Sequence, residues 1–138
     1  MSYWLMKTEP ETFSFDDLLK AGKTDWDGVR NHQAQNNMKA MKPGDRVLIY
    51  HSVSEKAVVG IAEVSKPAYP DPTAAPGEKW ICVQVKPVEK LKHPVSLQTI
   101  KETPALSEIA LVRQGRLSVM PLDRKDYDAI LALQFEKV

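Results

Sequence analysis

One short segment of the chain combines residue types that could bind a flat polar ring. In it, Trp26 stands between two aspartates and precedes Gly28-Val29-Arg30-Asn31, and the amide-rich stretch 32–37 follows. An aromatic face stacks on planar rings, while amide and guanidinium groups hydrogen-bond to ring edges. Gly28 permits a bend that gathers these groups. These residues therefore indicate recognition of a planar ring more than catalysis.

Trp26 has a second interpretation as an ordinary core residue, because large aromatic side chains are mostly buried. Its charged neighbours and the following glycine place the segment near the surface, which favours Trp26 lining a cavity. Trp4 and Trp80 lie inside strand-like patterns, and for them we expect a place in the core.

Several polar residues near this segment also have two interpretations. Arg30 and Asn31 could donate to a base edge or phosphate, or Arg30 could be solvated while Asn31 caps a helix. Lys7 is either a phosphate contact at a pocket rim or an exposed lysine at a strand end. The turn at Tyr69 and Asp71 is either an ordinary proline loop or a second pocket wall, whose carboxylate accepts from a ring N–H or amino group.

Support for catalysis is thin in this sequence. His51 and Ser52 are adjacent on an expected strand, so their side chains point to opposite faces and cannot act together. The sequence has no GxSxG, Walker, HExxH or CxxC motif. A lysine and a carboxylate brought together by the fold could still hydrolyse a substrate. The single cysteine, Cys82, excludes a disulfide framework, and we expect no cofactor and no metal.

Length and charge set further bounds. The 138 residues are 43% apolar and 27% charged, which fits one folded domain over residues 1–138. A net charge of +1 argues against a wide nucleic-acid footprint, so any such contact should be small, with a shallow salt dependence. Without a leader or a long apolar stretch, we expect a protein that is neither exported nor in a membrane, located in the cytoplasm or, in a eukaryote, the nucleus. We also expect a monomer.

The first half of the chain must position Lys7 and Trp26. Apolar, aromatic residues predict a strand over Tyr3–Lys7. Ser14 starts a helix in capping-box style with Asp17, and Gly22 stops it. A second helix is expected over 31–41, before the turn formed by Pro43, Gly44 and Asp45.

The middle of the chain reads as strands. Residues 46–52 and 57–65 form an expected hairpin, in which Gly60 marks a bulge or a close backbone approach. Four prolines within 67–77 predict a surface loop, and alternation over 80–88 predicts a third long strand.

The end of the chain adds a short helix at 97–101, a strand at 116–119 and a final helix capped by Asp123. Tyr127, Ile130, Leu131 and Leu133 form the apolar side of that helix. Strands dominate the middle without a βαβ rhythm. This order predicts an α+β domain whose sheet curls into a small mixed barrel flanked by short helices.

Motifs distributed from Tyr3 to about Leu133 resemble the EVE domain of the PUA-like superfamily. They are Tyr3-Trp4-Leu5-Met6-Lys7-Thr8-Glu9-Pro10, Phe13-Ser14, Trp26-Asp27-Gly28-Val29-Arg30-Asn31, Gln33-Ala34, Asn36, Gly44-Asp45, Tyr50-His51-Ser52, Gly60-Ile61-Ala62-Glu63-Val64, Trp80 and Arg116-Leu117-Ser118-Val119.

The resemblance implies a PUA-like β-barrel with a pocket for a modified nucleobase in DNA or RNA. The superfamily includes the YTH readers of N6-methyladenosine, whose Lys, Trp-turn and G-x-A-E pattern is similar to parts of this chain. By that analogy Trp26 stacks on the base, the backbone of 28–31 reads its edge and Lys7 meets phosphate. The loop at 69–71 would close the cage, with Tyr69 where YTH domains use a second aromatic.

The resulting hypothesis is a non-enzymatic reader of a modified base. Trp26 is the stacking platform. The residues expected to shape the pocket are Val29 to Asn31, His51, Ser52 and Ser118, and those expected near phosphate are Lys7, Arg30 and Arg116. The residues expected to bind are Lys7, Trp26, Gly28, Val29, Arg30, Asn31, Gln33, His51, Ser52, Tyr69, Asp71, Arg116 and Ser118. Two alternatives stay open: a small nucleoside-directed hydrolase, as the resemblance to ASCH-type PUA-like domains implies, and a protein-interaction module.

Overall fold

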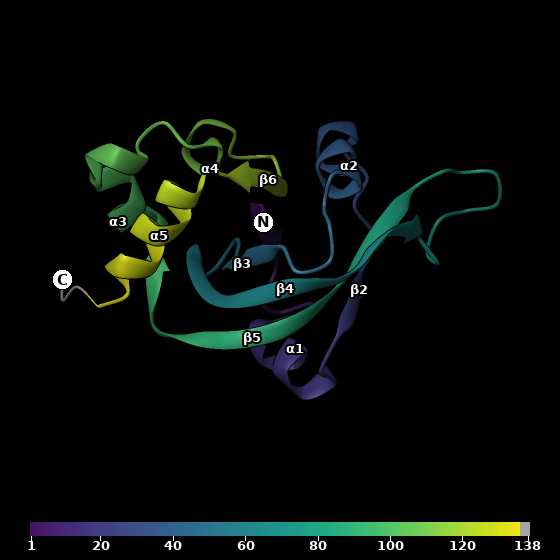
Figure 1. Cartoon of the computed structure of the whole chain (residues 1–138), viewed down its shortest axis with the longest axis horizontal. Coiled ribbons are helices and arrows are strands. Elements are labelled where there is room, and N and C mark those ends of the chain that lie inside the picture. The colour runs from purple at the N-terminus through teal and green to yellow at the C-terminus, as the bar shows by residue number, and fades with distance from the viewer. Residues whose placement is uncertain (136–138) are drawn as a thin grey trace.

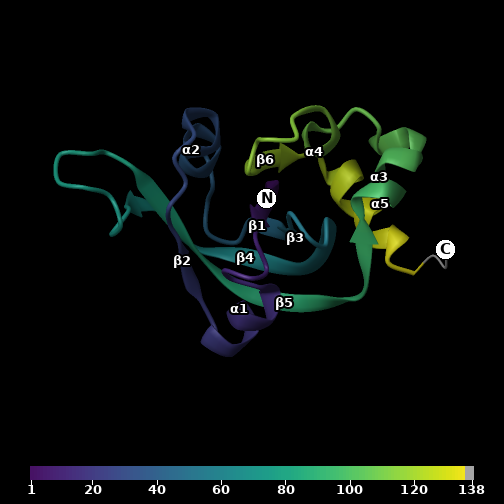
Figure 2. The same cartoon turned by 180° about the vertical axis from the view of Figure 1, so that it is seen from behind.

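The computed structural model describes residues 1–135 of the chain. A mixed six-stranded sheet forms the frame of the molecule (Figure 1). The strand order is β2-β5-β4-β3-β1-β6; β1 and β3 are parallel, and the other neighbouring pairs are antiparallel. The long strands β4 and β5 bend, so the sheet curves, and the last helices gather at one end (Figure 2). The predicted α+β class with a mixed, curled sheet is confirmed.

The elements follow one another along the chain in this order: β1 (Tyr3–Thr8), α1 (Phe15–Ala21), β2 (Thr24–Trp26), α2 (His32–Lys39), β3 (Arg46–His51), β4 (Ala57–Pro70), β5 (Ile81–Ser96), α3 (Leu97–Glu102), the 3-10 helix η1 (Pro104–Leu106), α4 (Ala110–Arg113), β6 (Val119–Leu122) and α5 (Arg124–Leu133).

The predicted helix starts around the pocket segment are confirmed. Ser14 and Asp17 form a reciprocal capping box at α1, which ends at Gly22 with φ +79°. The Asn31 side chain accepts from the Ala34 N–H at 2.9 Å and caps α2. Asn31 thus fixes where the segment after Trp26 turns into a helix.

The arm formed by β4 and β5 is longer than predicted. β4 continues through Pro67 to Pro70, where the sequence suggested a loop, and β5 runs on to Ser96. The prolines are tolerated because the pairing of β3 with β4 reaches only as far as Glu63. Beyond that point β4 pairs with β5 alone, so one side of it is a free edge that needs no N–H donor.

Other elements differ in smaller ways from the expectation. β2, η1 and α4 were not predicted, and the expected strand at 116–119 begins only at Val119. Trp4 is buried, and its Nε1 donates to Asp45 at 3.0 Å. Trp80, expected in the core, is instead half-buried against the side chains of Arg30 and His32.

Gly60 brings α1 against the sheet. A bulge at this point shifts the register of β4 against both of its neighbours. A Cβ at Gly60 would lie 2.5 Å from the ring of Phe15, which is 1% exposed. Both parts of the Gly60 prediction are therefore confirmed. No helix within residues 1–135 is long and apolar enough to cross a membrane.

Candidate base-binding site

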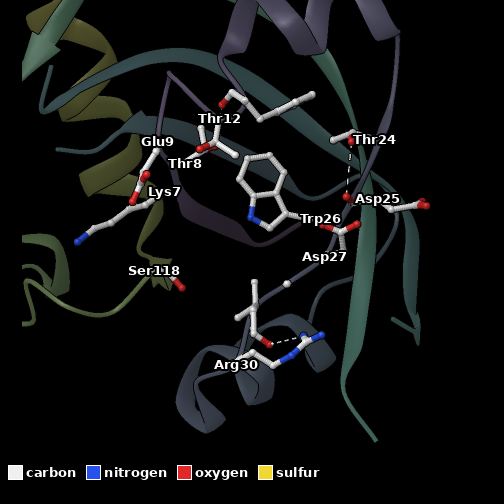
Figure 3. Close-up of a pocket in the computed structure, with 13 residues that line it drawn as sticks. Lys7, Thr8, Glu9, Thr12, Thr24, Asp25, Trp26, Asp27, Arg30 and Ser118 are labelled. Atoms are coloured by element: carbon white, nitrogen blue, oxygen red, sulfur yellow. Dashed lines mark hydrogen bonds between the residues drawn. The ribbon is translucent and has the colours of Figure 1, made fainter. Parts of the chain in front are cut away.

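A pocket of about 680 Å³ opens where the end of β1, the end of β2 and the approach to β6 meet (Figure 3). Its walls come from three separate segments of the chain. They are Lys7, Thr8, Glu9, Thr12 and Phe13; Thr24, Asp25, Trp26, Asp27, Gly28, Val29 and Arg30; and Ser118. Tertiary folding therefore adds two walls to the segment that the sequence pointed to.

Trp26 lies between the core and this pocket. It is 8% exposed, pairs with Val83 of β5, and meets the Phe13 ring edge-on at 6.5 Å between centroids. Its Nε1 has no hydrogen-bond partner among the described residues, which contain no buried side-chain nitrogen or oxygen without one. The indole N–H therefore reaches the solvent, and in Figure 3 it lies on the side of Lys7 and Ser118. Both interpretations of Trp26 thus describe part of its environment.

Asp71, in the loop after β4, holds the backbone that follows Trp26. Its Oδ2 accepts from the Gly28 N–H at 2.9 Å and from Arg30 at 3.0 Å, and its Oδ1 accepts from the Thr73 N–H and hydroxyl. Burial alone would raise the pKa of Asp71, but the hydrogen bonds from Thr73, Gly28 and Arg30 outweigh it and lower the pKa to about 2. Asp71 is thus a permanent carboxylate anchor.

The same contacts restrict what a ligand can meet. The Asp71 side chain is 0% exposed, so it cannot accept from a ligand, as the sequence suggested, unless these bonds break. Gly28, at φ +77°, already donates its N–H to Asp71. The N–H groups of Val29, Arg30 and Asn31 have no acceptor within the described part of the chain. The amides of Val29 and Arg30 are therefore free backbone donors in the pocket wall, and that of Asn31 is a free donor next to it.

Arg30 is held on several sides. Besides Asp71, it donates to Thr73 at 3.1 Å, and its guanidinium lies 5.3 Å from the centroid of the Trp80 ring. His32 packs on the same tryptophan at 5.2 Å between centroids. A guanidinium over an aromatic face is favourable, so Trp80 helps to fix Arg30 at the pocket.

Lys7 approaches the pocket from the end of β1. Its Nζ donates to the Gly115 carbonyl at 2.9 Å and lies 5.6 Å from the centroid of the Tyr50 ring. Its backbone N–H donates to the Ser118 carbonyl at 2.9 Å. Burial lowers the pKa of Lys7. Lys7 therefore links two pocket walls and still presents a cation beside them.

Six of the thirteen expected binding residues line this pocket: Lys7, Trp26, Gly28, Val29, Arg30 and Ser118. Gln33 and Arg116 line a separate hollow of about 310 Å³, together with Asn31. His51 accepts from the Phe15 N–H at 3.0 Å and pairs with Glu55, while Ser52 donates its N–H to Thr8. Tyr69 donates its hydroxyl to Asp25. Ligand contact by any of the thirteen stays a prediction.

The pocket also contains residues that the sequence reasoning left out. The Thr8–Phe13 wall could not be found locally, because β1 places it beside Trp26 only in the folded sheet. Asp25 and Asp27, however, flank Trp26 directly in the sequence, and that adjacency was an available signal. Within residues 1–135 no group of three or more histidine, cysteine or acidic side chains is arranged to hold a metal ion.

The family model of the EVE domain matches residues 2–133 of the chain. The chain belongs to the EVE domain family. Rat thymocyte nuclear protein 1 is 36% identical over 166 aligned residues, which cover 96% of this chain and 74% of the rat protein. The predicted family is therefore confirmed.

Solved EVE-type structures superpose closely on this chain. A crystal structure of an Agrobacterium tumefaciens protein has a TM-score of 0.95 at 41% identity and covers 98% of this chain and 94% of its own. The human THYN1 protein, crystallised in complex with DNA containing 5-methylcytosine, has a TM-score of 0.91 at 33% identity and full coverage of both chains. These matches confirm the predicted PUA-like fold.

Proposed function

We propose that this EVE domain binds a modified nucleobase in DNA or RNA without acting on it chemically, with Trp26 as the stacking surface. The observation that carries the proposal is the pocket itself, which combines an indole, an unpartnered indole N–H and free backbone amides. Stacking on one aromatic side chain contributes about 1–3 kcal/mol per base. Edge hydrogen bonds supply specificity at the same place.

The size and position of the pocket support a base that has left its helix. A volume of about 680 Å³ falls within the range of small-molecule pockets. A base inside a stack cannot enter such a cavity, so it must be flipped out at a cost of a few kcal/mol. Lys7 at the rim would then meet a phosphate on one side of the flipped base. Arg116, which lines the neighbouring hollow and lies two residues before Ser118, would meet a phosphate on the other side.

The human THYN1 complex supports the same conclusion from outside this chain, because that relative was crystallised with DNA containing 5-methylcytosine. A methyl group adds about 1 kcal/mol of apolar burial. We therefore propose modified cytosine in DNA as the first ligand to test, with modified RNA as the alternative polymer.

The test is a titration of short single-stranded oligonucleotides that carry one 5-methylcytosine or one cytosine against wild type, Trp26→Ala and Trp26→Phe. Wild type should prefer the modified strand, and Trp26→Ala should weaken binding roughly tenfold or more. Trp26→Phe keeps a ring face, so it should retain more affinity and controls for loss of folding. Equal affinity of wild type for both strands would reject the proposal.

Two alternatives are decided by further measurements. A hydrolase of the ASCH type would release product when incubated with a panel of modified nucleosides, and turnover beyond one equivalent would refute pure binding. A protein-interaction module would keep its function in Trp26→Ala.

The near-neutral charge sets the expected ionic-strength response. With a net charge of +1, few phosphates should be neutralised, so log Kd should change only shallowly with log salt. We further propose that the protein acts as a monomer. For its location we propose the cytoplasm, or the nucleus in a eukaryote.

A further inference from the structure

We propose that Asp27 makes the pocket selective for a base with an exocyclic amino group, of the cytosine or adenine type, and against thymine and uracil. Its carboxylate would accept a hydrogen bond from that amino group. This inference rests on the proposed function and adds the chemical class of base to it.

Asp27 lies in the pocket wall directly after Trp26. In Figure 3 its carboxylate is on the opposite side of Trp26 from Lys7, Glu9 and Ser118. The backbone around it is fixed, because the Asp27 N–H donates to the Asp25 carbonyl at 3.0 Å and the next N–H donates to Asp71. The Asp27 backbone therefore has a defined place beside the stacking surface, and its side chain starts from there.

Asp27 differs from the two aspartates near it in having no partner. Asp25 accepts from the Tyr69 hydroxyl, and Asp71 is occupied by Gly28, Arg30 and Thr73. Within residues 1–135 the Asp27 carboxylate has no hydrogen bond or ion pair with another residue, and only its own backbone N–H acts on it as a donor. Of these three aspartates, Asp27 is the one whose carboxylate remains free for a ligand.

The electrostatic surroundings favour a donor at this point. Partial burial and the nearby carboxylates of Asp71 and Asp25 raise the pKa of Asp27, and the hydrogen bond from its own backbone N–H and the charge of Arg30 only partly offset this. A hydrogen bond from a ligand amino group would offset this unfavourable environment of the charge.

The chemistry separates the two classes of base. An ionised carboxylate only accepts hydrogen bonds. Cytosine and adenine present an amino donor on the base-pairing edge, whereas thymine and uracil present a carbonyl oxygen at the corresponding position. A carbonyl facing the Asp27 carboxylate leaves two acceptors unpaired and repelling each other, which penalises the wrong base.

Glu9 provides a matched control. It also lines the pocket with an exposed carboxylate, but on the side of Lys7, away from the end of β2. Glu9→Gln changes one pocket carboxylate to an amide just as Asp27→Asn does, without altering the position next to Trp26.

The experiment compares 5-methylcytosine with thymine at one position of an otherwise identical single-stranded DNA. Both bases carry the 5-methyl group, so the pair isolates the amino group and the adjacent ring nitrogen. Wild type should prefer 5-methylcytosine by about tenfold or more. Asp27→Asn, whose amide both donates and accepts, should reduce the preference to within about threefold, while Glu9→Gln keeps it.

Thermal unfolding of each variant checks that the isosteric changes leave the fold intact. Full preference in a folded Asp27→Asn variant, or no preference in wild type, would overturn the inference. Trp26→Ala keeps the two proposals distinguishable. If Trp26→Ala abolishes binding while Asp27→Asn retains the preference, base stacking stands and only the role of Asp27 falls.

Discussion

Replacing Asp71 by asparagine removes the charge that holds the Gly28–Arg30 backbone beside the pocket. Asparagine keeps the size of the side chain, but it turns one acceptor oxygen into an NH₂ group that faces N–H donors. Arg30 also loses a partner at 3.0 Å, although it is 34% exposed and can be partly rehydrated. Asp71→Asn should therefore loosen the pocket and destabilise the fold.

The size of the effect follows from the pKa of Asp71. A pKa lowered from 3.8 to about 2 in a side chain that is 0% exposed corresponds to roughly 2.5 kcal/mol of stability at neutral pH. Because the folded-state pKa is the lower one, this contribution is complete above the unfolded pKa and is lost as pH falls through the folded pKa. Roughly 1 kcal/mol of it should be gone at about pH 3.

Urea unfolding at about pH 7 and pH 3 measures this contribution. Asp71→Asn should be less stable than wild type by about 2–3 kcal/mol at pH 7, and the difference should shrink by about 1 kcal/mol at pH 3. Asp16→Asn is a surface control, since Asp16 is 60% exposed and, within residues 1–135, forms an ion pair only with Lys90. It should change stability little at either pH. An Asp71→Asn variant as stable as wild type, or a difference independent of pH, would refute the role of Asp71 as an anchor.

Two further changes test the packing around α1. Gly60→Ala places a Cβ 2.5 Å from the ring of Phe15 and should lower the free energy of unfolding by about 1–3 kcal/mol. Gly115→Ala is the control, because its Cβ meets nothing within 4 Å and should leave stability unchanged. Equal urea midpoints for the two variants would contradict the close approach. Ser14→Ala removes one half of the capping box with Asp17 and should lower stability by about 1 kcal/mol, as a fall in the thermal midpoint; an unchanged midpoint would show that the cap is not needed.

The features predicted correctly from the sequence depend on neighbours in the chain. Ser14, Gly22 and Asn31 act within one helical turn of their positions, so residue type and spacing were sufficient. The segment after Trp26 was found for the same reason. Its charged flanks and Gly28 are visible in the sequence before any tertiary contact is known.

The features missed depend on contacts between distant parts of the chain. Pro67 and Pro70 fit in β4 only because β3 stops pairing before them, which no local pattern reveals. Likewise, three aspartates near Trp26 in space look alike in sequence. The β4–β5 arm brings Asp71 against the Gly28 backbone, where its carboxylate is buried, whereas Asp27 lines the pocket. Assigning their roles required the fold.

The close contact between Gly60 and Phe15 also bears on how this family can diverge. The Phe15 ring occupies the space where any other residue at position 60 would place its Cβ atom. A substitution at one of the two positions is therefore constrained by the residue at the other. In related chains a larger residue at the position of Gly60 should occur only with a smaller residue at the position of Phe15. The pair should therefore change together through evolution, although β2, α2 and β3 separate the two residues along the chain.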